Sequence, residues 1–500
     1  MGPPQVTRIA TVGRLDLTVA QRDIWLEQLS QGTSPLYNIG AYVALEGQVD
    51  RTRLTLALHH LASLHDALRT VWVQEGGSAR QRFAPQLPVT LMWDDLQADA
   101  HPTDAALNLL DAWMRMPIAL EQGPLWEARL IRMGPREHLL ALRAHHLVLD
   151  GWGVDQWFKQ LADLYLTLEH QQALPGSAPS YCAFIEEDAR YRASARYQRD
   201  REYWLTRLAQ LPDPLLRPTQ PALSPEDSPS HALDLAVTPG LMRKLRALAD
   251  TLGVSPLPVL LGALHVCVCR TWQRDQWMVG LPVRNRANAQ FKATLGLFTQ
   301  VSPLRMDFGR NLSFADLIQA IVATLKQDFR HQRYPLSALK RDVAAQQEGR
   351  TQLFELLVSF EEDSNALQIG DVAGATVMIC NGHEPSPLSI HLRCNTHAGT
   401  ARLHLVHSRA WFSDEQAKAL GARLLHVLEQ GLAQPQALVS AFDMLTAPEH
   451  QRLRAWNMTA MSAAHTAPCL IQQRIELQAR TQPGALAACF GDQTLSYGEL

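Results

Sequence analysis

Residues 145–151 read His-His-Leu-Val-Leu-Asp-Gly, and the fold is best predicted from this stretch outward. Upstream, apolar and polar side chains alternate over residues 126–130 before Gly134-Pro135, and an apolar run resumes at 139–142, a pattern typical of a β-hairpin. Downstream, apolar residues recur at helical spacing from Val154 to Leu168. We therefore predict that the tandem histidines lie between the end of a strand and the start of a helix.

The chemistry of this segment depends on which of its side chains face the same way. Imidazole moves protons near neutral pH, so a histidine at a strand end beside a helix start is a candidate general base or hydrogen-bond donor. Neighbours on an extended backbone point to opposite sides, so His145 and His146 would not share a metal ion, and no metal site is predicted. One histidine is expected to face the reaction and the other to pack inward. Asp150 could act as a base or anchor the loop through an arginine, and its place at a turn favours the anchor.

Length and composition restrict the class of protein. The chain has 500 residues, of which 46% are hydrophobic, so more than one lobe or domain is expected. The formal net charge of -3, without a long Lys/Arg block, leaves no electrostatic footprint for nucleic acid or an anionic membrane. The longest apolar stretch, Leu257–Cys269, is short for a bilayer span and predicts a buried helix. Because the N-terminus lacks a secretory pattern, we expect a cytoplasmic protein.

The cysteines give no sign of a disulfide framework or a zinc site. Seven cysteines are scattered through the chain, so reduced thiols are expected. Only Cys267 and Cys269 are close in sequence, and their alternate positions inside an apolar run favour core packing over metal ligation.

Periodicity elsewhere predicts a mixed α and β fold. The predicted helices span about residues 18–29, 51–69 and 186–211, and the predicted strands include 42–47, 356–360 and 401–406. A Pro/Ser stretch at 174–180 suggests the end of a first lobe.

The tandem-histidine segment resembles the His-His-x-x-x-Asp-Gly signature of condensation domains of nonribosomal peptide synthetases. Further stretches resemble other motifs of that family and follow in the family's order: Thr18–Trp25, His65–Arg69, Gly280–Arg286, Leu295–Gln300, Pro303–Arg305, His331–Pro335 and, weakly, Gly349–Phe354. The sixth motif departs from the family pattern because Arg333 stands where an acidic residue is usual. The matches span about residues 17 to 445.

The resemblance implies an α/β (α+β) fold of two chloramphenicol-acetyltransferase-like lobes, arranged in a V with a central tunnel. We expect an N-terminal lobe at 1–180 and a C-terminal lobe at 181–446. Trp456–Thr459 resembles the connector to an adenylation domain, and Phe490–Leu500 resembles the opening of that domain. We therefore expect a linker at 447–468 and an incomplete adenylation domain at 469–500. The chain would then be cut from a longer synthetase, in which the adenylation domain is a partner in cis.

The resemblance also implies a reaction, the attack of an acceptor α-amine on a donor thioester to give an amide. His146 is expected to accept the proton or orient the amine, while the backbone N–H of Gly151 helps to polarise the carbonyl. No intrinsic cofactor is expected, since the substrates are carried on the phosphopantetheine of a peptidyl carrier protein or on coenzyme A.

The remaining site residues are expected to support this centre. His145 is the inward histidine. By resemblance Asp150 pairs with an arginine of the other lobe, for which Arg286 is the first choice and Arg69 the second. Trp152, with the glycine after it, is expected to shape the tunnel.

The donor could be of two kinds. Only about sixteen residues precede the first motif, whereas a carrier domain needs several times that many, so the donor is expected in trans. A starter domain that takes an acyl group from acyl-CoA is favoured, also because Ser34–Gly40 looks similar to starter-type domains. An elongation domain fed by an upstream acyl carrier is the alternative. In both cases the acceptor is the peptidyl carrier protein of the same module.

Other classes fit less well. A cyclisation domain would carry aspartates in place of both histidines, an epimerisation domain would not precede an adenylation domain, and a plant-type or carnitine-type acyltransferase would lack the Trp456 connector. A non-catalytic platform for carrier proteins is the alternative of another class, and the presence of both His146 and Gly151 argues against it.

Overall fold

The computed structural model divides the chain into two compact units, residues 1–444 and 445–500. The described residues are 13–30, 32–75, 78–121, 123–216, 229–345, 352–363, 367–369, 372–374, 376–395, 399–458 and 470–500. The first part of the seventh-motif stretch, residues 349–351, lies outside them.

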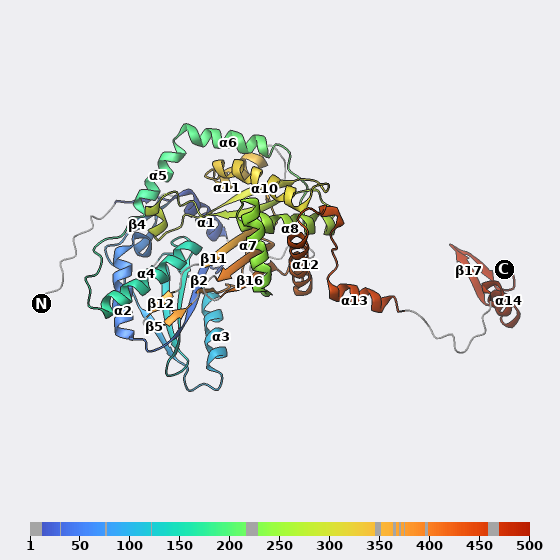
Figure 1. Ribbon diagram of the computed structural model, residues 1–500, viewed down its shortest axis with the longest axis horizontal. Coiled ribbons are helices and arrows are strands. Elements are labelled where there is room, and N and C mark those ends of the chain that lie inside the picture. Colours follow the sequence, from blue (N-terminus) through green and yellow to red (C-terminus); the bar gives the residue numbers. More distant parts are fainter. Residues whose placement is uncertain are drawn as a thin grey trace. The chain divides into compact units, whose positions relative to one another are not determined.

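The first lobe is built on a five-stranded sheet (Figure 1). Its strands, in spatial order, are β14 (Thr376–Met378), β2 (Asn38–Glu46), β7 (Glu137–His145), β6 (Trp126–Arg132) and β5 (Leu91–Asp95). The predicted hairpin is confirmed, since β6 and β7 pair antiparallel. Helices α2 (Arg51–Leu64) and α4 (Gly151–Glu169) pack on one face and α3 (Pro102–Met114) on the other. Because both faces are covered, β7 is buried from His138 to His145.

The second lobe is built on a six-stranded sheet. Its strands, in spatial order, are β10 (Gln300–Asp307), β9 (Gln276–Val283), β11 (Leu356–Asp363), β15 (Leu388–Asn395), β16 (Thr400–Ser408) and β8 (Ser230–Val237). Strand β11 runs parallel to both of its neighbours, whereas the other pairs are antiparallel.

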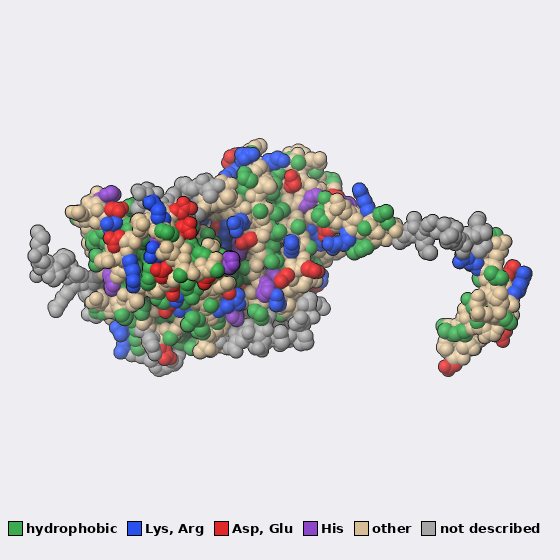
Figure 2. All heavy atoms as spheres, turned by 90° about the horizontal axis from the view of Figure 1, so that it is seen from below, with side chains coloured by type: hydrophobic (Ala, Val, Ile, Leu, Met, Phe, Trp, Pro, Cys, Tyr) green, Lys and Arg blue, Asp and Glu red, His purple; other side chains and the backbone are tan. Residues whose placement is uncertain are grey.

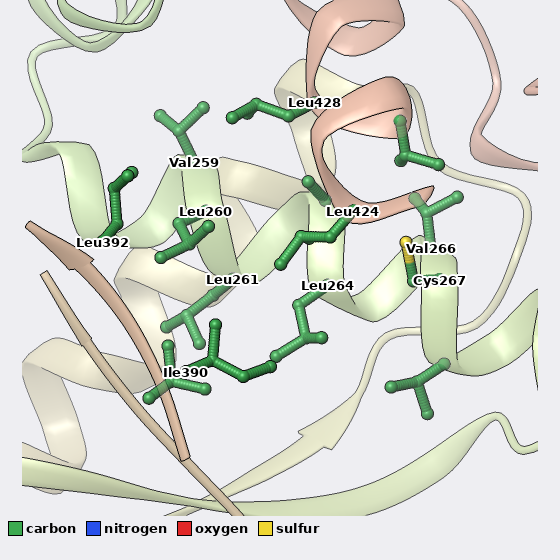
Figure 3. Close-up of a cluster of buried hydrophobic side chains, with 14 of the residues drawn as sticks. Val259, Leu260, Leu261, Leu264, Val266, Cys267, Ile390, Leu392, Leu424 and Leu428 are labelled. Carbon is green, nitrogen blue, oxygen red and sulfur yellow. The ribbon is translucent and has the colours of Figure 1, made fainter. Parts of the chain in front are cut away.

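One face of the second sheet carries the largest hydrophobic core. Helices α7 (Pro239–Leu252), α8 (Pro256–Thr271), α10 (Phe314–Asp328) and α12 (Asp414–Ala433) supply it. Figure 3 shows side chains of α8 packed between Ile390 and Leu392 of β15 and Leu424 and Leu428 of α12. Every residue from Pro258 to Cys269 is buried, so the prediction of a buried helix is confirmed, and both close cysteines lie in the core.

The second lobe contributes one strand to the sheet of the first lobe, which the sequence pattern does not predict. Strand β14 comes from residues of the second lobe and pairs antiparallel with β2 of the first, with Thr376 opposite Val43. The backbone N–H of Ile379 then donates to the Gly40 carbonyl. A division at residue 180 therefore describes the chain only in part, because the 376–379 segment crosses back.

Two predicted helices are interrupted. The helix expected at 51–69 ends at Leu64 and is followed by a short 3-10 helix, η1 (Asp66–Arg69). The helix expected at 186–211 is two helices, α5 (Cys182–Arg192) and α6 (Ala195–Arg207), because the Ser194 hydroxyl accepts from the Tyr197 N–H and starts a new helix. The remaining elements of this unit are β1 (Leu15–Asp16), α1 (Val19–Ser30), β3 (Thr70–Glu75), β4 (Ser78–Phe83), α9 (Ala289–Ala293), η2 (Phe329–His331), α11 (Leu336–Ala344), β12 (Leu367–Ile369), β13 (Val372–Gly374) and η3 (Val439–Ala441).

The second unit begins with a helix where a linker was expected. Helix α13 (Ala447–Trp456) starts at a capping box in which Thr446 and Glu449 bond each other's backbone, with Pro448 in its first turn. The rest of the expected linker, from 459 onward, lies outside the described residues. Helix α14 (Ile471–Thr481) precedes an antiparallel pair, β17 (Leu486–Phe490) and β18 (Gln493–Ser496).

The surface carries charges of both signs. On the face shown in Figure 2, acidic and basic side chains are interspersed with apolar ones. Among the described helices none is long and apolar enough by itself to cross a membrane; helices α7 and α8, bent by 106° to each other, meet the length and composition test only as a pair.

The core on the second sheet predicts a large effect of truncating α8. Leu264 is fully buried, so Leu264→Ala should lower the free energy of unfolding by about 2–5 kcal/mol through lost burial and a residual cavity. Leu56 is 55% exposed, and Leu56→Ala should change stability by less than about 0.5 kcal/mol. Urea unfolding of both variants measures this, and equal midpoints would contradict the described packing.

Candidate functional site

The segment 145–151 forms a strand, a turn and a helix start, as its pattern predicts. Strand β7 ends at His145, residues 146–148 form a turn, and α4 begins at Gly151. Asp150 has an extended backbone and caps the helix, because its Oδ1 accepts from the Gly153 N–H at 2.7 Å. The tandem histidines therefore sit where two rigid elements meet.

His146 is held through its backbone and keeps part of its side chain accessible. Its backbone N–H donates to the Tyr37 carbonyl at 2.7 Å. Burial lowers the pKa of the imidazole, while the Asp150 charge and the carbonyls of His146 and Leu149 raise it in part. The Nδ1 atom is buried without a well-formed hydrogen bond in the described part of the chain. The lowered pKa leaves the His146 ring neutral at neutral pH.

His145 lies inside the first lobe, as expected for the second histidine. Its Nδ1 accepts from the Leu147 N–H at 3.2 Å, so its Nε2 carries the proton and donates to Gln28 Oε1 at 3.3 Å. Burial, with the neighbouring His146, lowers its pKa to about 3. A ring held at both nitrogens supports the turn and is not free to exchange protons.

Asp150 and Arg286 form a fully buried ion pair between the two lobes. Arg286 Nη2 donates to Asp150 Oδ1 at 2.7 Å, with exposed side-chain fractions of 2% and 0%. The other carboxylate oxygen accepts from the backbone of Phe298 and Thr299 and from the Thr299 hydroxyl, at 2.9–3.0 Å. Burial alone would raise the pKa of Asp150, but the Arg286 charge and the N–H donors lower it below its ordinary value. The carboxylate stays charged and serves as an anchor.

The second-choice partner of Asp150 is wrong. Arg69 instead pairs with Asp66 at 3.0 Å, three residues away, and donates to the Ala84 carbonyl. Arg286 has no such local carboxylate; its other hydrogen bonds go to the carbonyls of Phe291, Thr294 and Gly296.

The residues after Asp150 differ in how closely they are packed. Gly151 is exposed, with open space where a Cβ would stand, and its N–H is among the first of α4, which have no partner within a helix. A Cβ on Gly153 would approach Leu149 to 3.1 Å. Trp152 Nε1 donates to the Lys292 carbonyl at 2.8 Å, and the Arg284 guanidinium lies 4.8 Å from its ring centroid. Trp152 thus contacts the second lobe, and its role in shaping a tunnel stays a prediction.

Several residues that position the site were not singled out from the sequence. Gln21 is buried and donates to the Leu147 carbonyl at 3.2 Å. Asn381 donates to the carbonyls of Pro35, Leu36 and Asn38. The Gln21 amide holds the turn after β7, and the Asn381 amide holds the turn before β2. Tyr37 lies in this second turn, and its carbonyl accepts from the His146 N–H. For Gln21 the resemblance to the first motif was the available signal.

The unusual Arg333 of the sixth motif has its own partner. Its guanidinium pairs with Glu187 of α5 at 2.8 Å and lies 4.4 Å from the Tyr191 ring centroid. An acidic residue in this position would face Glu187 with a like charge.

The buried anchor predicts a specific dependence of stability on pH. The folded-state pKa of Asp150 lies below the ordinary value of 3.8, so its contribution to stability is present above about pH 4 and is lost as the pH falls. Asp150→Asn should therefore be less stable than wild type near neutral pH, with a gap that narrows toward pH 2–3, as measured by urea unfolding across this range.

The control for this experiment is the exposed pair Arg115–Asp111. Asp111→Asn should shift stability by less than about 1 kcal/mol and leave its pH profile almost unchanged. Arg286→Met should destabilise by about 3–5 kcal/mol, since it leaves Asp150 buried without its charge partner. Equal pH profiles for wild type and Asp150→Asn would contradict the anchor.

Comparisons with known proteins agree on one family. A family model described as Condensation domain matches residues 12–454. A dimodular nonribosomal peptide synthase of Bacillus subtilis (strain 168) is 27% identical over 99% of this chain and 21% of its own length. The isonitrile lipopeptide synthase of Streptomyces coeruleorubidus is 30% identical over 66% of this chain and 22% of its own length. The chain thus spans less than a quarter of these curated relatives.

Solved structures share the fold. A starter condensation domain of rhizomide synthetase RzmA, solved as a mutant with C8-CoA, has a TM-score of 0.78 and 25% identity over 86% of this chain and 98% of its own. The first condensation domain of the calcium-dependent antibiotic synthetase, with a substrate analogue, has a TM-score of 0.78 and 24% identity over 87% of this chain and 100% of its own. The chain belongs to the condensation domain family of nonribosomal peptide synthetases.

Proposed function

We propose that this chain forms an amide between a donor acyl thioester and the α-amine of an aminoacyl group on a peptidyl carrier protein. The observation that carries the proposal is the neutral His146, presented by a turn that both lobes hold in place. The amine nitrogen attacks the thioester carbon, the C–S bond breaks, and the proton released by nitrogen ends on the thiol. The thioester is already activated, so alignment of two tethered reactants and removal of one proton are the main tasks.

His146 would accept that proton or orient the amine through Nε2. An α-amine has an ordinary pKa near 8 and must lose a proton as the new bond forms. A ring whose pKa is lowered by burial is unprotonated at neutral pH and available to accept it. The Gly151 N–H, at the start of α4, would polarise the carbonyl, while His145, Asp150 and Arg286 would maintain the geometry.

For the donor we propose acyl-CoA, which makes this a starter domain that N-acylates the first amino acid. The similarity to the RzmA starter domain, solved with C8-CoA, supports this. The alternative is an elongation domain that takes a peptidyl or aminoacyl group from an upstream carrier protein. In either case the substrates would be carried as thioesters of phosphopantetheine or coenzyme A, and no intrinsic cofactor would be needed. The unit at 445–500 would lead into an adenylation domain in cis.

The His146 assignment predicts a large loss of turnover on truncation. His146→Ala should reduce amide formation by about 10²–10⁴-fold, because the proton acceptor is removed. The assay measures N-acyl-aminoacyl carrier by intact mass, with the aminoacylated carrier of the same module as acceptor. The matched control is His59→Ala, on the exposed side of α2, which should retain wild-type rates. Wild-type turnover by His146→Ala would overturn the assignment, and a wild-type protein that binds carriers without forming product would favour the non-catalytic platform.

The donor assignment is tested separately with the wild-type protein. A panel of acyl-CoA donors and loaded upstream carriers is offered to the same acceptor, and product is detected by mass. We expect turnover with acyl-CoA. Turnover only with an aminoacylated or peptidylated upstream carrier would favour the elongation domain.

A further inference from the structure

The second-lobe sheet has one apolar face and one polar face. On β15 the side chains of Leu388, Ile390 and Leu392 enter the core with α8 and α12. The alternate residues, Ser389, His391 and Arg393, point to the opposite face. Packing of the hydrophobic core explains the apolar residues of this central strand. It does not explain the row of polar residues on the other face.

Strand register extends this polar face into a ladder across four strands. His391 lies opposite Ser359 of β11 on one side and His404 of β16 on the other, and His404 lies opposite Asp234 of β8. The next rung pairs Arg393 with Glu361 in the same way. We call Ser359, His391, His404 and Asp234 the histidine ladder.

The hydrogen bonds of the ladder determine which nitrogen of His391 carries its proton. The charges of Arg393 and His391 and the hydrogen bonds to Glu361 lower its pKa, so this carboxylate is ionised and can only accept. The Ser359 hydroxyl donates to Glu361 Oε1 at 2.6 Å, so its oxygen must accept from His391 Nδ1 at 2.7 Å. Burial lowers the pKa of His391, and the ring is neutral. Its Nε2 therefore carries a lone pair.

His404 follows the same logic. Its Nδ1 lies 2.8 Å from Asp234 Oδ1, and the pKa of Asp234 is lowered chiefly by that contact, so Nδ1–H donates to a carboxylate. The two rings lie 6.0 Å apart. Within the described residues neither Nε2 has a hydrogen-bond partner, and neither is among the fully buried atoms that lack one.

One end of the histidine ladder, at Asp234, lies within electrostatic range of Tyr42 in the first lobe. Burial raises the pKa of Tyr42 on β2, and the charges of Arg402 and Asp234 act on the same hydroxyl. At the other end of β15, burial raises the pKa of Glu384 to about 7, and this carboxyl acts on Tyr37, whose carbonyl holds the His146 N–H.

The accessibility of the ladder differs from that of a solvated sheet face. The side chains of His391 and His404 are only 14% and 13% exposed, whereas Asp234 at the sheet edge is 47% exposed. Ser389, on the same face, is fully buried. A mostly buried side chain that keeps an acceptor atom without a partner is suited to a ligand that donates a hydrogen bond.

We propose that the histidine ladder is a specificity subsite that accepts a hydrogen bond from a hydroxyl, amide or amino group on one of the two substrates. This inference rests on the proposed condensation function and adds to it the class of substrate. His391 Nε2 is the acceptor of this subsite. Because the ladder carries no apolar surface for an alkyl chain, the substrate that meets it bears a polar group. The same chemistry could come from the acyl donor or from the acceptor amino acid, and the two sources are separated by experiment.

The test uses matched pairs that differ by one hydroxyl. In the donor arm, octanoyl-CoA and β-hydroxyoctanoyl-CoA compete for one aminoacyl carrier. In the acceptor arm, valyl and threonyl carriers compete for one donor. We expect the hydroxylated member to be preferred in one arm by about three- to tenfold in kcat/KM, the range of one net hydrogen bond. The arm that shows the preference identifies the substrate that meets the ladder.

Variants connect the preference to the ladder. His391→Phe should lower kcat/KM for the hydroxylated substrate and so abolish the preference, and His391→Gln, which retains an acceptor oxygen, should restore part of it. His231→Phe is the matched control. His231 lies on β8 of the same sheet, but on the apolar face and not on the face of the ladder, because Leu233, two residues further along the strand, packs against the core. Thermal unfolding of each variant verifies that it is folded.

The outcomes separate this inference from the function on which it rests. Product without any preference in both arms, or a preference that survives in His391→Phe, would overturn the ladder and leave the condensation function standing. No product from any pair with wild-type protein would overturn the condensation function and the subsite with it.

Discussion

A buried carboxylate at Asp150 is the constraint on which the rest of the site depends. A charge without solvent access is tolerated only when its oxygens are paired, and Asp150 is paired by the α4 backbone, by Arg286 and by the Phe298–Thr299 backbone. These partners come from both lobes, so satisfying one charge fixes the start of α4 against the second lobe. The turn that carries His146 lies between β7 and this fixed point.

Burial and fixed carboxylates set the state of the histidines. His145 and His146 are both kept neutral by their surroundings, but only His145 is bonded at both nitrogens. His404 Nδ1 donates directly to Asp234, and His391 Nδ1 donates to the Ser359 hydroxyl, which leaves Nε2 of the neutral His391 ring as an acceptor. The same physical rule therefore yields a candidate base at the turn and a candidate hydrogen-bond acceptor on the second sheet.

The two sheets are buried in different ways. Strand β7 lies between helices on both faces, so its apolar side chains pack on both sides and its buried Arg143 and His145 are hydrogen-bonded. Strand β15 has core helices on one face, so its polar residues alternate with its core residues. The β14 crossover and the Asn381 amide tie the polar face of the second sheet to the segment that positions His146.

Local pattern in the sequence determined the strand, turn and helix around His146, the hairpin before it and the buried helix at 256–271, because periodicity and caps act over a few residues. The pairing of Asp150 with Arg286 was expected only from a family resemblance, since 136 residues separate the two. Tertiary structure alone decided the β14 crossover and the alignment of Ser359, His391, His404 and Asp234, because strand register brings together residues with no shared local pattern. It also decided which nitrogen of His391 donates, because its partner Ser359 is 32 residues away.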